Sequence, residues 1–178
     1  MIKHSVYLRA LEPDDYLVSI KWRNDEEIRS LIGGASFFVS SETERRWVIE
    51  NIENTQKYVF AICKSDDKKY IGNFIIHEID WRNKSVVTGI MIGEKNEWNK
   101  GYAYEAMLLG LRYVFNEMNM NRVEVLILEK NLASMKLHEK CGFKIEGKLR
   151  KSIYKNGVYQ NQYILGLLKE DFVCYLEM

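Results

Sequence analysis

The stretch Trp98-Asn-Lys-Gly-Tyr-Ala-Tyr-Glu-Ala106 joins a strand-like run, Ser85–Ile92, to a segment with helical spacing of apolar residues over 101–118. A glycine at a helix start lets the backbone turn sharply, and the first amide N–H groups of any helix lack partners within it. These groups and the helix dipole together attract phosphate oxygens. Gly101 therefore predicts a phosphate-binding turn, although a left-handed turn before a surface helix would also explain a lone glycine.

Two better-known phosphate-binding loops do not fit this stretch. A Walker A loop requires the pattern GxxxxGK[ST], which the chain lacks, and the dinucleotide fingerprint requires GxGxxG, where this stretch has one glycine. Ala103 keeps the backbone open to a close approach, and Lys100 adds positive charge. A phosphate site of another kind is therefore expected.

The N-terminal half predicts two helices and an antiparallel meander. Pro13 opens a helix through about Trp22, and Ser41 with Glu44 fits a capping box for a helix that carries Trp47. Strands are expected over residues 3–9, 58–63, 70–79 and 85–92, the last three joined by short turns.

The C-terminal part predicts a strand, a helix and a hairpin. Val123–Leu128 is apolar on both faces, as a central strand should be. Asn131 is a good N-cap for a helix that ends at Cys141, where Gly142 provides a left-handed stop. Asn156-Gly157 predicts a tight turn between two further strands, over 144–154 and 158–168.

These elements predict an α/β (α+β) fold. The expected core is a mixed, mostly antiparallel sheet of about seven strands with helices on both faces. No shift in composition marks a boundary, so a single domain over residues 1–178 is expected.

The helix after Asn131 carries a second group of polar residues. At 100° per residue, Asn131, Ser134 and His138 fall on one narrow stripe, beside an apolar stripe of Ala133, Leu137 and Cys141. Polar groups next to a buried edge can face a cleft. Taken singly, Asn131 is explained as well by helix capping, and Ser134 by an ordinary surface position.

Together the two stretches resemble the GNAT superfamily of N-acetyltransferases. Trp98–Ala103 fills the pyrophosphate frame R/Q-x-x-G-x-G/A with Trp98 in the first place, and Asn131–Phe143 followed by Glu146-Gly147 resembles the second conserved block. The form W-x-K-G-Y-A-x-E-A is similar to the branch of ribosomal-protein N-terminal and spermidine acetyltransferases. This resemblance covers nearly the whole chain.

The resemblance implies acetyl-CoA as co-substrate and a primary amine as acceptor, such as a protein N-terminus, a polyamine or another small amine. It implies direct attack within a ternary complex, in a gap between the strands 86–92 and 123–128, the first of which is expected to bulge. The implied catalytic residues are His138, as proton donor to the leaving thiolate, and Ser134. The implied coenzyme-binding residues are Met91, Ile92, Trp98, Asn99, Lys100, Gly101, Tyr102, Ala103, Tyr104, Asn131, Ser134 and His138. A non-catalytic acyl-CoA sensor using the same pocket is the main alternative.

The general base and the acceptor pocket are less defined. The expected bulged strand has Val87-Thr88-Gly89 where many relatives have a glutamate, so Glu78 or Glu124 acting through a water is considered, as is a neutral amine that needs no base. The aromatic residues that could shape the acceptor pocket are Phe37, Phe38, Trp47, Trp81 and Tyr159, and the acidic residues that could attract a cation are Glu26, Glu27 and Glu42.

Composition limits the other function classes. The chain has 26 Lys and Arg against 25 Asp and Glu, which provides no overall field for nucleic acid or an anionic membrane. Its three cysteines and three histidines are widely spaced, so no metal is expected. The absence of a long apolar run indicates a cytoplasmic protein without a membrane partner, and homodimers are implied by the resemblance alone.

Overall fold

The computed structural model describes residues 4–34 and 37–172, and all of its strands belong to one seven-stranded sheet with the order β1-β2-β3-β4-β5-β7-β6. The strands are β1 (Val6–Ala10), β2 (Tyr58–Lys64), β3 (Tyr70–Asp80), β4 (Ser85–Ile92), β5 (Arg122–Leu128), β6 (Lys144–Lys155) and β7 (Val158–Leu168). Adjacent strands pair antiparallel except β4 and β5, which are parallel.

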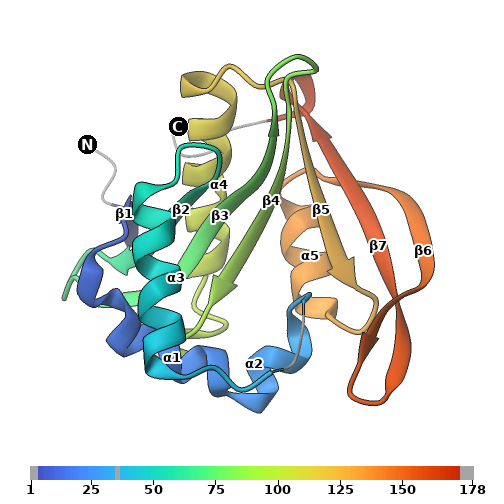
Figure 1. The fold of residues 1–178 in the computed structure, drawn as a ribbon. Coiled ribbons are helices and arrows are strands. Elements are labelled where there is room, and N and C mark those ends of the chain that lie inside the picture. Colours follow the sequence, from blue (N-terminus) through green and yellow to red (C-terminus); the bar gives the residue numbers. More distant parts are fainter. Residues whose placement is uncertain (1–3, 35–36, 173–178) are drawn as a thin grey trace.

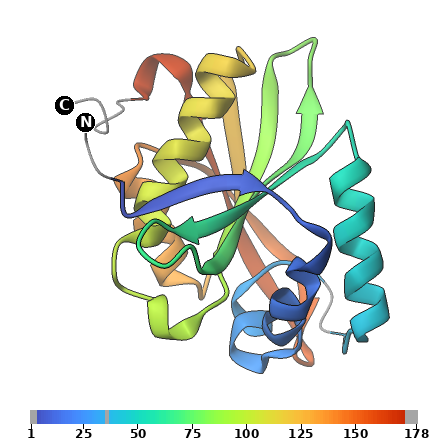
Figure 2. The same ribbon diagram turned by 90° about the vertical axis from the view of Figure 1, so that its left-hand side faces the viewer.

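Helices cover both faces of this sheet (Figures 1 and 2). The α-helices are α1 (Tyr16–Asn24), α2 (Glu26–Leu31), α3 (Ser41–Glu53), α4 (Tyr102–Arg112) and α5 (Leu132–Lys140). Short turns of 3-10 helix lie at Pro13–Asp15, Lys95–Glu97 and Lys169–Asp171, and a π-helical turn over Tyr113–Glu117 extends α4. The predicted fold class is therefore confirmed.

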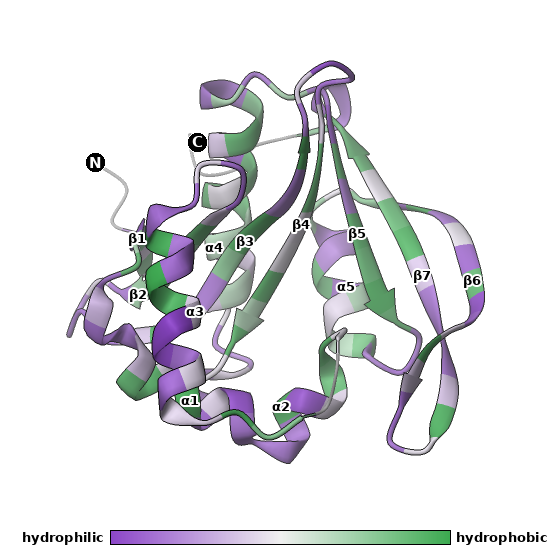
Figure 3. Ribbon diagram, viewed as in Figure 1, coloured by the Kyte–Doolittle hydropathy of each residue, from purple (hydrophilic) through white to green (hydrophobic). Residues whose placement is uncertain are grey.

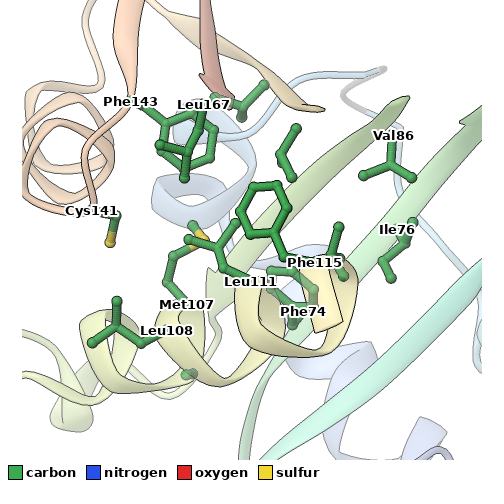
Figure 4. Packing of buried hydrophobic residues seen from close by; sticks show 14 of the residues in the cluster. Phe74, Ile76, Val86, Met107, Leu108, Leu111, Phe115, Cys141, Phe143 and Leu167 are labelled. Atoms are coloured by element: carbon green, nitrogen blue, oxygen red, sulfur yellow. The ribbon is translucent and has the colours of Figure 1, made fainter. Parts of the chain in front are cut away.

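The main core lies between α4 and the sheet. Phe74 of β3 is fully buried under Gly110 of α4, where an added Cβ would come within 2.5 Å of the Phe74 ring. In Figure 4, side chains of α4 and the following π turn, including Met107, Leu111 and Phe115, pack toward the sheet. Figure 3 shows the hydrophobic residues concentrated along the central strands, with hydrophilic residues prominent on α3. This core holds α4 against the sheet.

The strands β4 and β5 separate after a short paired stretch. Their pairing is confined to Ser85–Val87 of β4 and Arg122–Glu124 of β5, and beyond it the two strands diverge, with α5 lying behind the gap (Figure 1). Backbone groups on the facing edges of β4 and β5 therefore have no partners across the gap. The structure confirms the splayed pair of strands that the resemblance implied.

Two local expectations were wrong. Ser40, not Ser41, caps α3: its hydroxyl accepts a hydrogen bond from the Thr43 amide, and the predicted capping partner Glu44 is buried against Ser19 and Arg23 instead. The expected bulge in β4 is absent from that strand. The register shift between the two strands places the extra residue, His77, on β3.

A third N-terminal helix, α2, was not predicted, but most of the remaining secondary structure follows the sequence. Asn131 caps α5, Gly142 ends it with φ of 94°, and Asn156-Gly157 forms the hairpin turn with φ of 52° and 79°. The first strand begins at Val6, later than residue 3, and residues 1–3 lie outside the described chain. Within the described residues, no helix is long and apolar enough to cross a membrane.

Candidate functional site

A cavity of about 300 Å³ lies where β4 ends and α4 begins. Ten of the twelve predicted coenzyme-binding residues line it: Met91, Ile92, Trp98, Asn99, Gly101, Tyr102, Ala103, Tyr104, Asn131 and Ser134. We call this the donor cavity. The other two residues do not line it: the Lys100 Nζ donates to Glu97, which does line the cavity, and His138 lines a neighbouring cavity. The stretch Trp98–Ala106 and the second block, Asn131–Phe143, therefore both contribute residues to the donor cavity.

The turn before α4 has the backbone shape of an anion site. Asn99 and Gly101 both have positive φ, of 61° and 88°, so successive amide groups turn toward the same side. The Tyr104 amide is the first to bond back to the turn, to the Gly101 carbonyl at 3.1 Å. The amides that precede it at the helix N-terminus are therefore free to bind an anion.

Trp98 anchors this turn to the strand before it. Its indole Nε1–H donates to the Ile92 carbonyl at 2.7 Å, and its ring packs against the smaller core cluster under α1 and α3. Lys100 ion-pairs with the mostly buried Glu97 at 2.9 Å, and Lys64 lies 3.8 Å from the same carboxylate. The Glu97 charge beside the donor cavity is thus offset by two cations.

A second cavity of about 450 Å³ adjoins the donor cavity. It extends across β3 and β4 toward α1 and α3, and into the gap between β4 and β5. The two cavities share the lining residues Leu31, Ile32, Ile90, Met91, Asn131 and Ser134. We call the second one the acceptor cavity, because a molecule in it would meet a molecule in the donor cavity at this shared wall.

Asn131 performs two structural tasks at the shared wall. Its Oδ1 accepts from the Ser134 amide at 3.0 Å and caps α5, while its Nδ2 donates to the Leu31 carbonyl at 2.8 Å. The side chain therefore ties the end of α2 to the start of α5. The sequence predicted the cap, but the second bond joins segments a hundred residues apart.

Lys155 holds the segment after α2, whose residues Ile32 and Gly34 line the acceptor cavity next to Leu31. It is buried at 2% exposure, and its Nζ donates to the Ile32 and Gly34 carbonyls at 2.7 and 3.1 Å. Burial, together with the charges of Lys130 and Arg29, lowers the pKa of Lys155. A lysine next to a hairpin turn gives no sequence signal for such a role, so this residue was missed.

Replacing Asn131 separates its two tasks. Asn131→Asp keeps an oxygen that can cap α5 but loses the hydrogen bond to the Leu31 carbonyl, so we expect a stability loss of about 1 kcal/mol together with weaker acetyl-CoA binding. Asn131→Ala also loses the cap, which should lower the free energy of unfolding by about 1 kcal/mol more. Denaturant unfolding and equilibrium binding measure the two effects separately. Equal acetyl-CoA affinity in wild type and Asn131→Asp would show that the tie to Leu31 does not shape the cavity.

The His138 ring is buried at 1% exposure against Phe143, with ring centroids 5.0 Å apart. Its Nδ1 lies 2.8 Å from the Ser134 carbonyl, and because a carbonyl oxygen can only accept, Nδ1 carries the proton. Nε2 is buried without a partner in the described chain. Burial lowers the pKa of His138, so the ring is neutral near pH 7 and Nε2 is an acceptor. Ser134 positions this ring through its carbonyl and also lines both cavities.

The acceptor cavity is lined by one of the aromatic residues proposed from the sequence and by none of the proposed acidic residues. Of the five aromatic candidates, Trp47 alone lines it. The others, Phe37, Phe38, Trp81 and Tyr159, are exposed, at 51% to 85%. Glu27 pairs with Lys95 at 3.2 Å, and Glu42 lies 4.0 Å from Arg45. The carboxylate that lines the cavity is Glu44, which the sequence had assigned to a helix cap.

Neither carboxylate considered as a base lines either cavity. Glu124 accepts from the Arg122 Nε at 2.7 Å, and Glu78 is exposed on β3. Across the ranges 4–34 and 37–172, no group of three His, Cys, Asp or Glu side chains is arranged to hold a metal ion.

Comparison with known proteins agrees with this geometry. The acetyltransferase (GNAT) domain family matches residues 5–144. The chain is 30% identical to the SPbeta prophage-derived uncharacterized N-acetyltransferase YokL of Bacillus subtilis, over 93% of this chain and 90% of that protein. It is 28% identical to the uncharacterized N-acetyltransferase p20 of Bacillus licheniformis, over 93% of each.

Among solved structures, the fold is similar to that of the spermidine N-acetyltransferase from Vibrio cholerae in complex with CoA and spermine. The TM-score is 0.87 at 24% identity, covering 94% of this chain and 97% of that one. A GNAT-family acetyltransferase from Bacillus anthracis matches with a TM-score of 0.83 at 23% identity, covering 96% and 98%. These two structures thus share the overall fold of this chain.

Proposed function

The chain belongs to the acetyltransferase (GNAT) family, and we propose that this N-acetyltransferase moves the acetyl group of acetyl-CoA onto a primary amine by direct attack in a ternary complex. The observation that carries the proposal is the shared wall between the two cavities. A donor bound along one cavity and an amine bound in the other meet at this wall. Holding both reactants there converts a bimolecular reaction into an effectively unimolecular one.

The donor cavity fits a molecule that has a pyrophosphate at one end and a thioester at the other. The turn at Asn99–Gly101 and the free amides of α4 suit the phosphates. The unpaired edge of β4 around Met91 and Ile92 suits an extended amide chain and a carbonyl oxygen that becomes negative during attack. These residues support acetyl-CoA as the co-substrate.

His138 offers one route for the proton. An amine that attacks a thioester carbonyl must lose a proton, and the departing thiolate must gain one. We propose that the neutral His138 Nε2 takes the proton from the attacking nitrogen and passes it to the sulfur. The Ser134 carbonyl keeps the Nδ1–H fixed and stabilises the transient imidazolium. For an amine that binds in its neutral form, His138 is a donor only after it has been an acceptor, and the transfer from nitrogen to sulfur needs no further base.

Exchanging His138 for phenylalanine tests this route. His138→Phe fills the same space against Phe143 but cannot carry a proton, so kcat should fall about 100-fold with little change in KM for acetyl-CoA. An unchanged kcat would remove His138 from the mechanism. The pH profile distinguishes the two forms of the ring. A neutral acceptor gives kcat that rises with pH through a pKa below the ordinary 6.5, whereas an imidazolium donor gives kcat that falls there.

The alternative function is a non-catalytic acyl-CoA sensor that uses the same donor cavity. Both functions predict binding, so thermal unfolding with acetyl-CoA is the first test: ligand at about 100 times Kd should add about 2.7 kcal/mol. Release of free CoA thiol with a panel of amines then separates the enzyme from the sensor. Binding without amine-dependent thiol release would favour the sensor, and absence of binding would contradict both.

We propose a cytoplasmic enzyme that works without nucleic acid or membrane. Support comes from the near-neutral net charge of +1 and from Cys63 and Cys141, which are buried free thiols. Cys174 lies outside the described residues. A homodimer is a further proposal, which sedimentation equilibrium tests: a monomer mass at micromolar concentration would contradict it.

A further inference from the structure

The acceptor cavity holds one positive and one negative side chain among its described lining residues: Arg23 of α1 and Glu44 of α3. Glu44 is buried at 1% exposure, and its Oε1 accepts from the Ser19 hydroxyl at 2.6 Å. The Arg23 Nε lies 3.4 Å from the Glu44 Oε2, and neither atom has a hydrogen bond in the described chain. Glu44 thus has one hydrogen bond, from Ser19, and one ion pair, with Arg23, whereas the outer guanidinium nitrogens of Arg23 have no hydrogen bond within the described residues.

A second cation stands at the same end of the cavity. Arg23 lies 5.8 Å and the Lys57 ammonium 5.6 Å from the centre of the Trp47 ring. Burial and then the charge of Arg23 lower the pKa of Lys57. His77, which lines the cavity, has its pKa lowered by burial and by Lys57. Glu44 thus pairs with one of the two cations that lie beside Trp47.

This charge pattern discriminates between amine acceptors. A polyamine carries several ammonium groups and needs several carboxylates, but the described lining offers one, which faces Arg23. A carboxylate on the acceptor would instead meet the outer nitrogens of Arg23, in a geometry that guanidinium groups bind well. Thr88 and His138 also line the cavity, and Thr88 Oγ1 and His138 Nε2, which are buried without partners in the described chain, are available as acceptors for the N–H groups of a bound amine.

We propose that the acceptor is a small amine that also carries a carboxylate, of the amino-acid class, and that Arg23 binds this carboxylate. The inference rests on the proposed acetyl transfer to an amine and specifies its substrate. Glu44, fixed by Ser19, is a positioning residue that orients the guanidinium. The volume of about 450 Å³ suits a single small molecule.

The test uses pairs of acceptors that differ in one group. Amino acids and their amides share the amine but not the carboxylate, and spermidine serves as the polycation. We expect the acids to be acetylated with kcat/KM about tenfold or more above the amides, and spermidine to be poor. Equal rates for acids and amides, or a preference for spermidine, would overturn the inference while leaving acetyl transfer intact. If no amine releases thiol, the proposed function itself fails.

Variants locate the effect at Arg23. Arg23→Met should raise KM for the acids about tenfold, with no change for the amides. The double variant Arg23→Met with Glu44→Gln removes both charges, so the same loss is measurable without an unpaired buried carboxylate. Arg45→Met on the exposed side of α3 is the matched control and should leave KM unchanged. An unchanged KM for the acids in the double variant would overturn the role of Arg23.

Discussion

Gly101→Val should lower the affinity for acetyl-CoA by about 100-fold, equivalent to about 2.7 kcal/mol. Gly101 adopts φ of 88°, where a β-branched residue is strained by about 1–2 kcal/mol. A Cβ at this position meets no atom within 4 Å, so the protein itself has room for the side chain. The loss therefore arises from a distorted turn and from a side chain in the path of the phosphates. Isothermal titration with acetyl-CoA measures it.

Gly157→Val is the matched control. Gly157 has φ of 79° and also has no atom within 4 Å of an added Cβ, but it lies in the hairpin turn between β6 and β7, outside both cavities. Both variants should lose similar stability, and Gly101→Val alone should lose binding. If the two variants bind acetyl-CoA equally well, the turn before α4 is not the phosphate site.

Phe74→Ala should lower the free energy of unfolding by about 3–5 kcal/mol. The Phe74 ring is fully buried between β3 and α4, and Gly110 approaches it so closely that neighbouring atoms cannot collapse far into the cavity left behind. Chemical denaturation monitored by circular dichroism gives the value. Because α4 begins at the phosphate turn, acetyl-CoA affinity should decrease as well.

Phe37→Ala provides the comparison for Phe74, because Phe37 is 75% exposed. Its removal should change the free energy of unfolding by less than about 0.5 kcal/mol. A loss at Phe37 as large as that at Phe74 would mean that the core assigned to α4 and the sheet does not dominate stability.

The fold followed from the sequence where the signals are local. Asn131, Gly142 and Asn156-Gly157 each determine a cap, a stop or a turn through their own backbone preferences, and all three were predicted correctly. The cap of α3 was assigned to the wrong serine because Ser40 and Ser41 carry the same local preference. Glu44 instead forms a hydrogen bond with Ser19 and an ion pair with Arg23, both on α1, and the local sequence around Ser41 does not reveal these contacts.

The site was predictable in part for the same reason. The turn at Gly101 and the stripe on α5 are local patterns, and the structure brings both to the donor cavity. The acceptor side depends on contacts between distant segments, such as Lys155 with Ile32 and Gly34. The aromatic residues chosen by type alone fell mostly on the surface, because Phe37, Phe38 and Trp81 lie in a loop and a turn, where no periodic pattern tells which side chains are buried.

We propose that one wall joins a coenzyme site to an amine site in this protein, and the rate of CoA thiol release tests this arrangement most directly. With saturating acetyl-CoA, we predict slow release without an amine and a saturable, amine-dependent increase when a primary amine is added. Mass spectrometry should find the acetyl group on the amine nitrogen. Tight acetyl-CoA binding with a release rate that no amine from any class increases would contradict the account.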